Sequence, residues 1–314
     1  MSELEAVDLV FRRLGLSVLQ RGWLSSNNIV FAAHGHVPGT VVDTGYDTHS
    51  AQTLELLLAA LDGAAPERVV NTHLHSDHCG GNALLQQAFG CEVRVPEASF
   101  EAARLWDADR LTFNATDQRC QRFAVDAALE AGQTLTMGAA DWRVLAAPGH
   151  DPEAVMLYQA ETGVLISADA LWEERLAIIF PELDGEDGFR PARDALLLIE
   201  ELRPRIVIPG HGRPFTDVAS ALSHSRRRLD QFEGDPRKHW RYAMRALVMF
   251  HMLDHRQRGM TDLVEWMIAA PVFRRAHLET AGAGGDPREA AIETVERLVA
   301  DGILLRHGGN VVCA

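Results

Sequence analysis

The hydrophobic and polar positions of the first 215 residues predict short strands interspersed with helices. Two β-rich runs, Ile29–Ala33 and Thr40–Asp43, flank a segment with Gly and Pro, which is typical of a hairpin. Leucines recur at helical spacing in Ala51–Leu61, and Arg190–Leu202 is amphipathic. Further helices are predicted at Ala83–Phe89 and Ala98–Trp106, and further strands at Arg68–Asn71, Glu92–Val95, Trp142–Ala146, Ala154–Gln159, Val164–Ser167 and Arg205–Pro209. This mixture predicts a layered α/β architecture, with sheets covered by helices.

The pattern becomes helical after about Pro214. The predicted helices, with almost no strand between them, are Val218–Phe232, Trp240–Leu253, Thr261–Ala269 and Arg288–Asp301. The last segment, Gly302–Cys313, has two short apolar runs around a Gly pair, and a helix followed by such a hairpin is typical of a winged-helix ending. We therefore expect one domain over residues 1–215 and a helical domain with a winged-helix-like end over residues 216–314.

Composition and charge narrow the class of protein. Of the 314 residues, 47% are hydrophobic and 24% are charged, so the chain can bury a sizeable core and is not disordered. The formal net charge of −14 argues against bulk binding to nucleic acid or to an anionic membrane. The chain has neither an apolar run of membrane-spanning length nor a signal-peptide pattern, and its 4 cysteines show no C-x-x-C spacing. We expect a cytoplasmic protein with reduced thiols.

The strongest chemical signal is the run Thr72–His78, directly after a predicted strand. It contains His73, His75, Asp77 and His78, and Gly80–Gly81 follows, where the backbone can pass close to a site. Imidazole nitrogens and carboxylate oxygens suit zinc, iron or manganese. Crowding of these residues has no packing rationale, so a metal site is favoured over a solvated polar loop.

Three further candidates follow apolar strands downstream. His150 and His211 each come after a Pro-Gly pair. Asp169 lies in Ala-Asp-Ala, directly after the predicted strand Val164–Ser167. Loops that follow strands gather at one edge of a sheet. Any one of the three alone would be typical of a cap or a turn, but together with the first cluster they complete seven metal ligands.

The chain resembles the metallo-β-lactamase superfamily of hydrolases. The H-x-H-x-D-H motif matches in full within Thr72–His78, the later ligands match in order, and Asp43-Thr44-Gly45 matches the early D-x-G turn. The resemblance covers roughly residues 20–215 and implies an αββα sandwich with a catalytic site at one edge of the paired sheets. It implies one metal on His73, His75 and His150, a second on Asp77, His78 and His211, a bridging Asp169, and an Asp43 that supports the ligand loop.

The resemblance also implies the chemistry. Two divalent ions, zinc in first place with iron or manganese also suited, would hold a hydroxide that attacks a carbonyl, and Asp77 would orient it and pass on its proton. We expect hydrolysis of a small-molecule thioester or ester. An endoribonuclease, a lactonase or β-lactam hydrolase, and a winged-helix regulator with a vestigial enzyme domain are the alternatives. Glyoxalase II shares all seven ligands, but the motif of its C-terminal glutathione site is missing here.

Substrate contacts are less clearly encoded. Trp172, Ile179 and Phe180 could line an apolar pocket for an acyl chain, or simply pack their loop down. Acidic residues of the same loop would repel polyanions such as RNA. Basic residues over 226–245, six arginines and Lys238, could meet a phosphate-bearing carrier such as coenzyme A, or form the solvated face of a helix. The apolar face of Trp240–Leu253 indicates core or a homodimer interface, with His251 packed inside.

Overall fold

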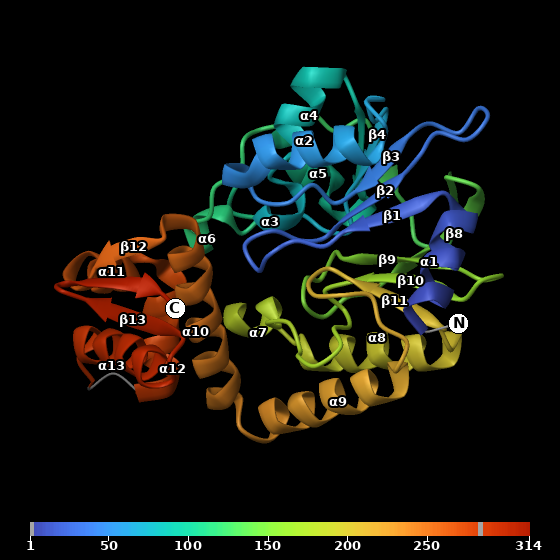
Figure 1. The fold of residues 1–314 in the computed structure, drawn as a ribbon. Helices are drawn as coiled ribbons and strands as arrows, with labels where there is room; N and C mark the ends of the chain where they lie inside the picture. Colours follow the sequence, from blue (N-terminus) through green and yellow to red (C-terminus); the bar gives the residue numbers. More distant parts are fainter. Residues whose placement is uncertain (1–2, 282–284) are drawn as a thin grey trace.

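Residues 3–281 and 285–314 are described in the computed structural model, and two sheets form its centre (Figure 1). In the first sheet, β1–β3 are antiparallel and β3–β6 are parallel. Its strands, in spatial order, are β1 (Leu16–Leu19), β2 (Asn28–Phe31), β3 (Thr40–Val42), β4 (Arg68–Val70), β5 (Glu92–Pro96) and β6 (Ala127–Leu129). The second sheet consists of β11 (Ile206–Pro209), β10 (Val164–Ala168), β9 (Val155–Gln159), β8 (Ala140–Ala146) and β7 (Thr134–Met137), with β10 and β11 parallel.

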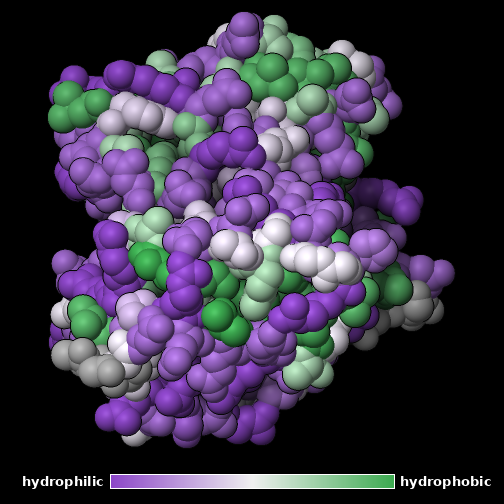
Figure 2. Space-filling view, turned by 90° about the vertical axis from the view of Figure 1, so that its left-hand side faces the viewer, coloured by the Kyte–Doolittle hydropathy of each residue, from purple (hydrophilic) through white to green (hydrophobic). Residues whose placement is uncertain are grey.

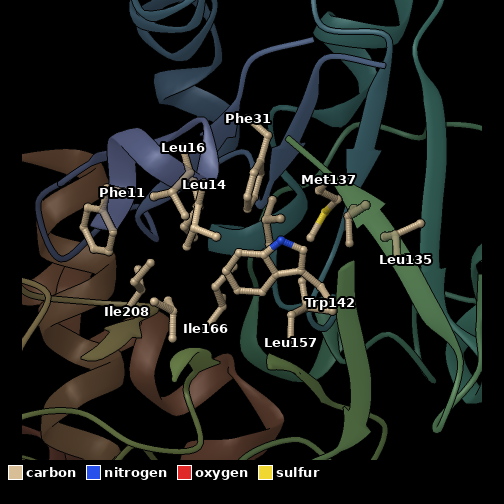
Figure 3. Close-up of a cluster of buried hydrophobic side chains, with 14 of the residues drawn as sticks. Phe11, Leu14, Leu16, Phe31, Leu135, Met137, Trp142, Leu157, Ile166 and Ile208 are labelled. Atoms are coloured by element: carbon tan, nitrogen blue, oxygen red, sulfur yellow. The ribbon is translucent and has the colours of Figure 1, made fainter. Parts of the chain in front are cut away.

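The two sheets enclose one apolar core, centred on Trp142 of β8. Phe31 of the first sheet meets the Trp142 ring edge to face at 5.4 Å, and Leu157 and Ile166 of the second sheet lie on the other side (Figure 3). Helix α1 (Glu3–Leu14) closes one side of this core with Phe11 and Leu14. The short strands form because their side chains are buried on both faces, as the patterns of β3, β4 and β10 show.

Helices cover the outer faces of both sheets. On the first sheet these are α2 (Ser50–Ala60), α4 (Asn82–Phe89) and α5 (Glu97–Leu105), and on the second they are α8 (Phe189–Leu202) and α9 (Val218–Gly234) (Figure 1). The helices on each sheet share one apolar core with the outer face of that sheet. The predicted four-layer αββα architecture is therefore confirmed. Helix α9 packs on α8, although the predicted domain boundary at 215/216 assigned it to the second domain.

The C-terminal region is helical and ends in a hairpin, as predicted. It consists of α10 (Pro236–His255), β12 (Gln257–Gly259), α11 (Met260–Ala269), α12 (Pro271–Ala281), α13 (Pro287–Ala300), β13 (Leu304–His307) and β14 (Asn310–Cys313). β12 adds a third strand, giving the order β12-β14-β13. The winged-helix assignment and the domain boundary stay predictions.

The apolar face of α10 packs into the apolar core of the C-terminal region. Trp240, Met244, Leu247 and Val248 are buried in the C-terminal core, and His251 is buried against Trp266, so the core interpretation of this face is confirmed. The outer side of this region is mainly hydrophilic, with hydrophobic residues in separate patches (Figure 2). The homodimer stays a prediction.

Several elements were not predicted. These are α1, β1, β6, β7, β12, α12 and the short helices α3 (Ser76–Cys79), α6 (Phe113–Thr116) and α7 (Phe180–Asp184). Most have three to five residues, too few for a periodic pattern to emerge. Within the described ranges, no helix combines the length and apolarity that a membrane crossing requires.

Replacing Trp142 with Ala should strongly destabilise the fold, because the side chain is fully buried between the sheets. We expect Trp142→Ala to lower the free energy of unfolding by about 3–5 kcal/mol, as measured by urea denaturation. The exposed Leu197 of α8 provides a control, and Leu197→Ala should change the free energy of unfolding by no more than about 0.5 kcal/mol. Equal effects of the two variants would contradict the central position of Trp142.

Candidate metal centre

The structure brings all seven predicted ligand residues together at one edge of the sandwich. The first four follow β4, and the others follow β8, β10 and β11. Candidate ligand atoms lie within 4.8 Å of one another in three overlapping groups. The groups are His73, His75 and His150; His73, His78 and Asp169; and Asp77, His78 and His211.

The Asp169 carboxylate lies between the two histidine groups. Its Oδ2 is 3.4 Å from His150 Nε2 on one side and 3.9 Å from His211 Nε2 on the other, and its Oδ1 is 3.5 Å from His78 Nε2. His150 Nε2 is also 2.8 Å from His75 Nδ1. The Asp169 carboxylate is thus placed beside both histidine groups, and the pair of metal sites that shares it stays a prediction.

Asp43 orients the ligand loop from behind. Its Oδ2 lies 2.7 Å from His78 Nδ1 and also accepts a hydrogen bond from the Thr72 hydroxyl, while its Oδ1 accepts one from the Thr72 N–H. Asp43 is almost fully buried and has a φ of 57°, a left-handed conformation that Asp tolerates better than most residues. The predicted supporting role of Asp43 therefore has a geometric basis, since a carboxylate on one ring nitrogen fixes the other for a metal.

The other histidines are oriented in the same manner. Thr72 Oγ1 lies 3.1 Å from His73 Nδ1, and the Ile178 carbonyl lies 2.6 Å from His150 Nδ1. His75 Nε2 lies 3.6 Å from Asp151, a residue that the sequence pattern did not single out. Asp151 directly follows His150 in the sequence, and that proximity to a candidate ligand could have indicated it.

The buried nitrogens that face the cluster fit a metal. Among the residues that the structure describes, His73 Nε2 and His78 Nε2 are buried and have no hydrogen-bond partner. A buried polar atom without a partner is costly, and coordination to a metal would satisfy it. The nitrogen and carboxylate donor set suits divalent zinc, iron or manganese.

The charge states also fit metal binding. Burial, together with the neighbouring histidines, lowers the pKa of His73 well below its usual value, and burial lowers the pKa of His75 and of His150 to about 4. These rings are therefore neutral at pH 7, the form that binds metal. Burial disfavours the carboxylate of Asp169, but His78 and His211 outweigh it and hold its pKa well below the usual range.

Close backbone approach shapes the site at Gly210. A Cβ there would lie 2.0 Å from Asp169 Oδ1 and 2.9 Å from His78 Cε1, so any side chain would displace a ligand residue. Gly80 is also too close to its neighbours for a side chain, because an added Cβ would lie 2.3 Å from the Asp47 amide nitrogen. Glycine at these positions lets the ligand loops come together.

Of the predicted substrate residues, Trp172 and Phe180 lie beside the metal cluster, whereas Ile179 is buried in the loop. Phe180 lies 4.5 Å from the His75 ring, and Trp172 lies 5.3 Å from the His211 ring and donates to Asp169 Oδ1. Ile179 is 1% exposed, so it packs the loop down rather than lining an open pocket. Trp23 stacks on His211 and was missed, because no local pattern connects it with the site.

Most of the acidic residues at the mouth are neutralised by partners. Glu173 pairs with Arg213, Asp184 with Arg275, and Asp187 with Arg190. The sequence-based picture of a uniformly acidic mouth is thus too simple. In the basic stretch, Arg226 pairs with Glu200 and Arg245 with Asp301, as expected of a solvated helix face.

Known proteins resemble this chain in sequence and in fold. The family model described as "Metallo-beta-lactamase superfamily" matches residues 21–211. A hydroxyacylglutathione hydrolase of Methylococcus capsulatus is 30% identical over 50% of this chain and 52% of its own length. An acyl-coenzyme A thioesterase, MBLAC2 of Gallus gallus, is 26% identical over 64% of this chain and 79% of its own.

The chain spans about half to two thirds of the length of the first curated relatives that it matches. Among solved structures, a metallo-beta-lactamase family protein from Thermus thermophilus has a TM-score of 0.54 at 21% identity. The match covers 96% of this chain and 99% of that protein. At this identity the likeness concerns the fold, and it includes the C-terminal region.

Replacing Asp43 with Asn should weaken metal binding, because the charged acceptor of the His78 ring is lost while the backbone conformation is tolerated. We expect the zinc affinity of Asp43→Asn to fall by about 10- to 100-fold in competition with a chelator of known affinity. Asp194 is exposed on α8, and Asp194→Asn should bind zinc as the wild type does. Equal affinities in both variants would rule out the orienting role.

The metal-free protein should lose stability in mild acid. Burial lowers the pKa of His75, His150 and His239 to about 4 and that of His251 to about 3. The unfolded chain takes up these protons near pH 6.5, so the stability is present above about 6.5 and is lost as the pH falls through about 4.

We expect a slope of up to ~1.4 kcal/mol per pH unit for each such histidine between these limits, in urea denaturation with a chelator present. His239→Gln should reduce the slope, and a substitution of the exposed His36 by Gln should leave it unchanged. A free energy of unfolding that stays constant from pH 6.5 to 4 would contradict the neutral buried histidines.

Proposed function

Because the chain belongs to the metallo-beta-lactamase superfamily, whose family model matches residues 21–211, we propose that it hydrolyses a small-molecule thioester or ester with two divalent metal ions. The observation that carries the proposal is the Asp169 carboxylate between two sets of buried histidines. A shared carboxylate of this kind suits two neighbouring cations.

The residues divide into two proposed metal sites. His73, His75 and His150 would hold one ion, and Asp77, His78 and His211 the other, with Asp169 shared. When bound, the pair of ions would polarise the substrate carbonyl and lower the pKa of the attacking water. Zinc is the ion that we propose, and iron or manganese would suit the same donors.

Asp77 has the clearest further role. Its Oδ2 lies 3.0 Å from His211 Nε2 and 4.0 Å from His78 Nε2, so one carboxylate oxygen faces this half of the cluster. The proximity of His78 holds the pKa of Asp77 below its usual value despite burial, and the carboxylate is ionised at pH 7. An ionised carboxylate there can orient the attacking water and accept its proton.

A protein nucleophile is not needed for this chemistry. Cys79 adjoins His78 in sequence, but its Sγ lies 3.7 Å from Cys120 Sγ and contacts the Leu74 carbonyl in the interior. Burial raises the pKa of the Cys79 thiol well above its usual value, which disfavours the reactive thiolate.

The thioester preference rests on the relatives and on the lining of the site. The matched relatives include a hydroxyacylglutathione hydrolase and an acyl-coenzyme A thioesterase. Phe180 offers an apolar surface beside His75 and His150, where an acyl group would lie. The described cysteines are free, in line with the proposed cytoplasmic location.

Hydrolysis should depend on metal and on Asp77. We expect chelation to abolish turnover of a small acyl thioester, zinc to restore it, and Asp77→Asn to lower kcat by about 100-fold or more, because the water loses its proton acceptor. His75→Ala should lower both metal content and turnover. Asp194→Asn serves as the control and should keep wild-type rates. Turnover that survives both chelation and His75→Ala would refute a metal-dependent mechanism.

A further inference from the structure

Two tryptophans enclose the His211 side of the cluster. Trp23 stacks on the His211 ring with centroids 5.3 Å apart and planes 10° apart, and the Trp172 ring meets both at an angle. Trp172 also donates from Nε1 to Asp169 Oδ1 at 3.1 Å. The indoles thus form a corner whose position is fixed by two of the ligand residues.

A positive charge lies on this corner. The guanidinium carbon of Arg175 is 5.1 Å from the centre of the Trp23 ring, and both side chains are exposed, Trp23 to 46%. Across the described ranges 3–281 and 285–314, Arg175 has no carboxylate partner, whereas Glu173, two residues earlier, already pairs with Arg213. Arg175 therefore keeps its hydrogen-bond donors for a ligand.

Its position over an indole face makes this cation a defined binding group. A guanidinium over an aromatic face is attracted to the ring while its N–H donors stay available to a phosphate or a carboxylate. Contact with Trp23 also restricts the rotamers of Arg175, so less conformational entropy is lost when an anion binds.

The two ends of the cluster are chemically different. Phe180 borders His75 and His150, whereas Trp23, Trp172 and Arg175 border the His211 end. An acyl chain matches the apolar end. A substrate lying across the cluster would then direct its leaving group to the end with the unpaired cation.

We propose that Trp23 and Arg175 form a specificity-determining subsite for the negatively charged part of a thiol leaving group. This inference rests on the proposed thioester hydrolysis. A phosphate-bearing thiol such as coenzyme A and a carboxylate-bearing thiol such as glutathione share the required anionic chemistry, and the experiment distinguishes them.

The test compares three butyryl thioesters with the zinc-loaded enzyme. Coenzyme A and glutathione provide anionic leaving groups, and N-acetylcysteamine provides a neutral one. We expect Arg175→Gln to lower the ratio of kcat/KM for an anionic to that for the neutral thioester by about fivefold, and Arg175→Glu by more. Arg175→Lys should retain part of the preference, since it keeps the charge but not the planar guanidinium.

Arg297→Gln is the matched control, because Arg297 is an exposed arginine of α13 that pairs with Glu293, outside the loop that borders the site, and its removal changes the net charge equally. It should leave the ratio unchanged. The wild-type preference should also weaken as the salt concentration rises. The thioester whose ratio falls identifies the leaving group that the subsite binds.

Two results would overturn the subsite. An equal loss of kcat/KM on all three thioesters in Arg175→Gln would show that Arg175 acts on the fold, and an unchanged ratio would show that it does not touch the leaving group.

If the wild type cleaves none of the thioesters, the proposed function fails. Calorimetric titration with free coenzyme A and glutathione then decides the subsite. Binding of either thiol that is weaker to Arg175→Gln than to the wild type supports it. Equal binding to both proteins, or no binding to the wild type, overturns it.

Discussion

The hydrogen bonds to the buried Asp43 carboxylate hold the whole site in place. Asp43 lies at the end of β3 and accepts from the backbone and the hydroxyl of Thr72 and from His78. These bonds connect β3 to the first and last parts of the ligand loop after β4. The N–H of Thr44 also donates to the His78 carbonyl at 2.7 Å, which fixes the same loop a second time. With this loop fixed, the ligands that follow β8, β10 and β11 need only reach one point.

The same burial that orders these groups makes the metal-free site electrostatically costly. Asp43, Asp77 and Asp169 surround His78 and raise its pKa well above the usual value, although burial of the ring opposes this. His73, His75 and His150 lie close by in neutral form. A cation placed among these donors would offset the negative charge and satisfy the unpartnered nitrogens. The cluster is thus organised for binding a metal more than for stabilising the fold.

The gathering of the seven candidate ligand residues could be predicted because their types and spacing are local properties of the chain. The candidate ligands are dense between His73 and His78, and His150 and His211 each follow a Pro-Gly pair. Tertiary contacts decided the rest. Nothing near Trp23 indicates that its ring stacks on a residue far along the chain, and Ile179 and Phe180 are adjacent apolar residues of which one is core and the other faces the site. The αββα layers were predicted, whereas the short β6 and β7 were not, because a few residues carry too little periodicity.

The C-terminal region contributes to the site although the family match ends at residue 211. The loop after β10 carries Trp172, Arg175 and Phe180, and α10 and α12 hold it by hydrogen bonds. His239 accepts from the Ile179 N–H, the Tyr242 hydroxyl donates to the Leu176 carbonyl, and Arg275 donates to the Leu183 carbonyl.

Figure 1 shows α7, the last part of this loop, between the C-terminal helices and the sheets. The carbonyl that orients His150 belongs to Ile178, inside the same pinned segment. Changes in how α10 and α12 pack would therefore reach both the candidate ligand His150 and the loop residues beside the cluster. The two sheets supply the candidate ligands, and the C-terminal helices hold the loop that lies beside them.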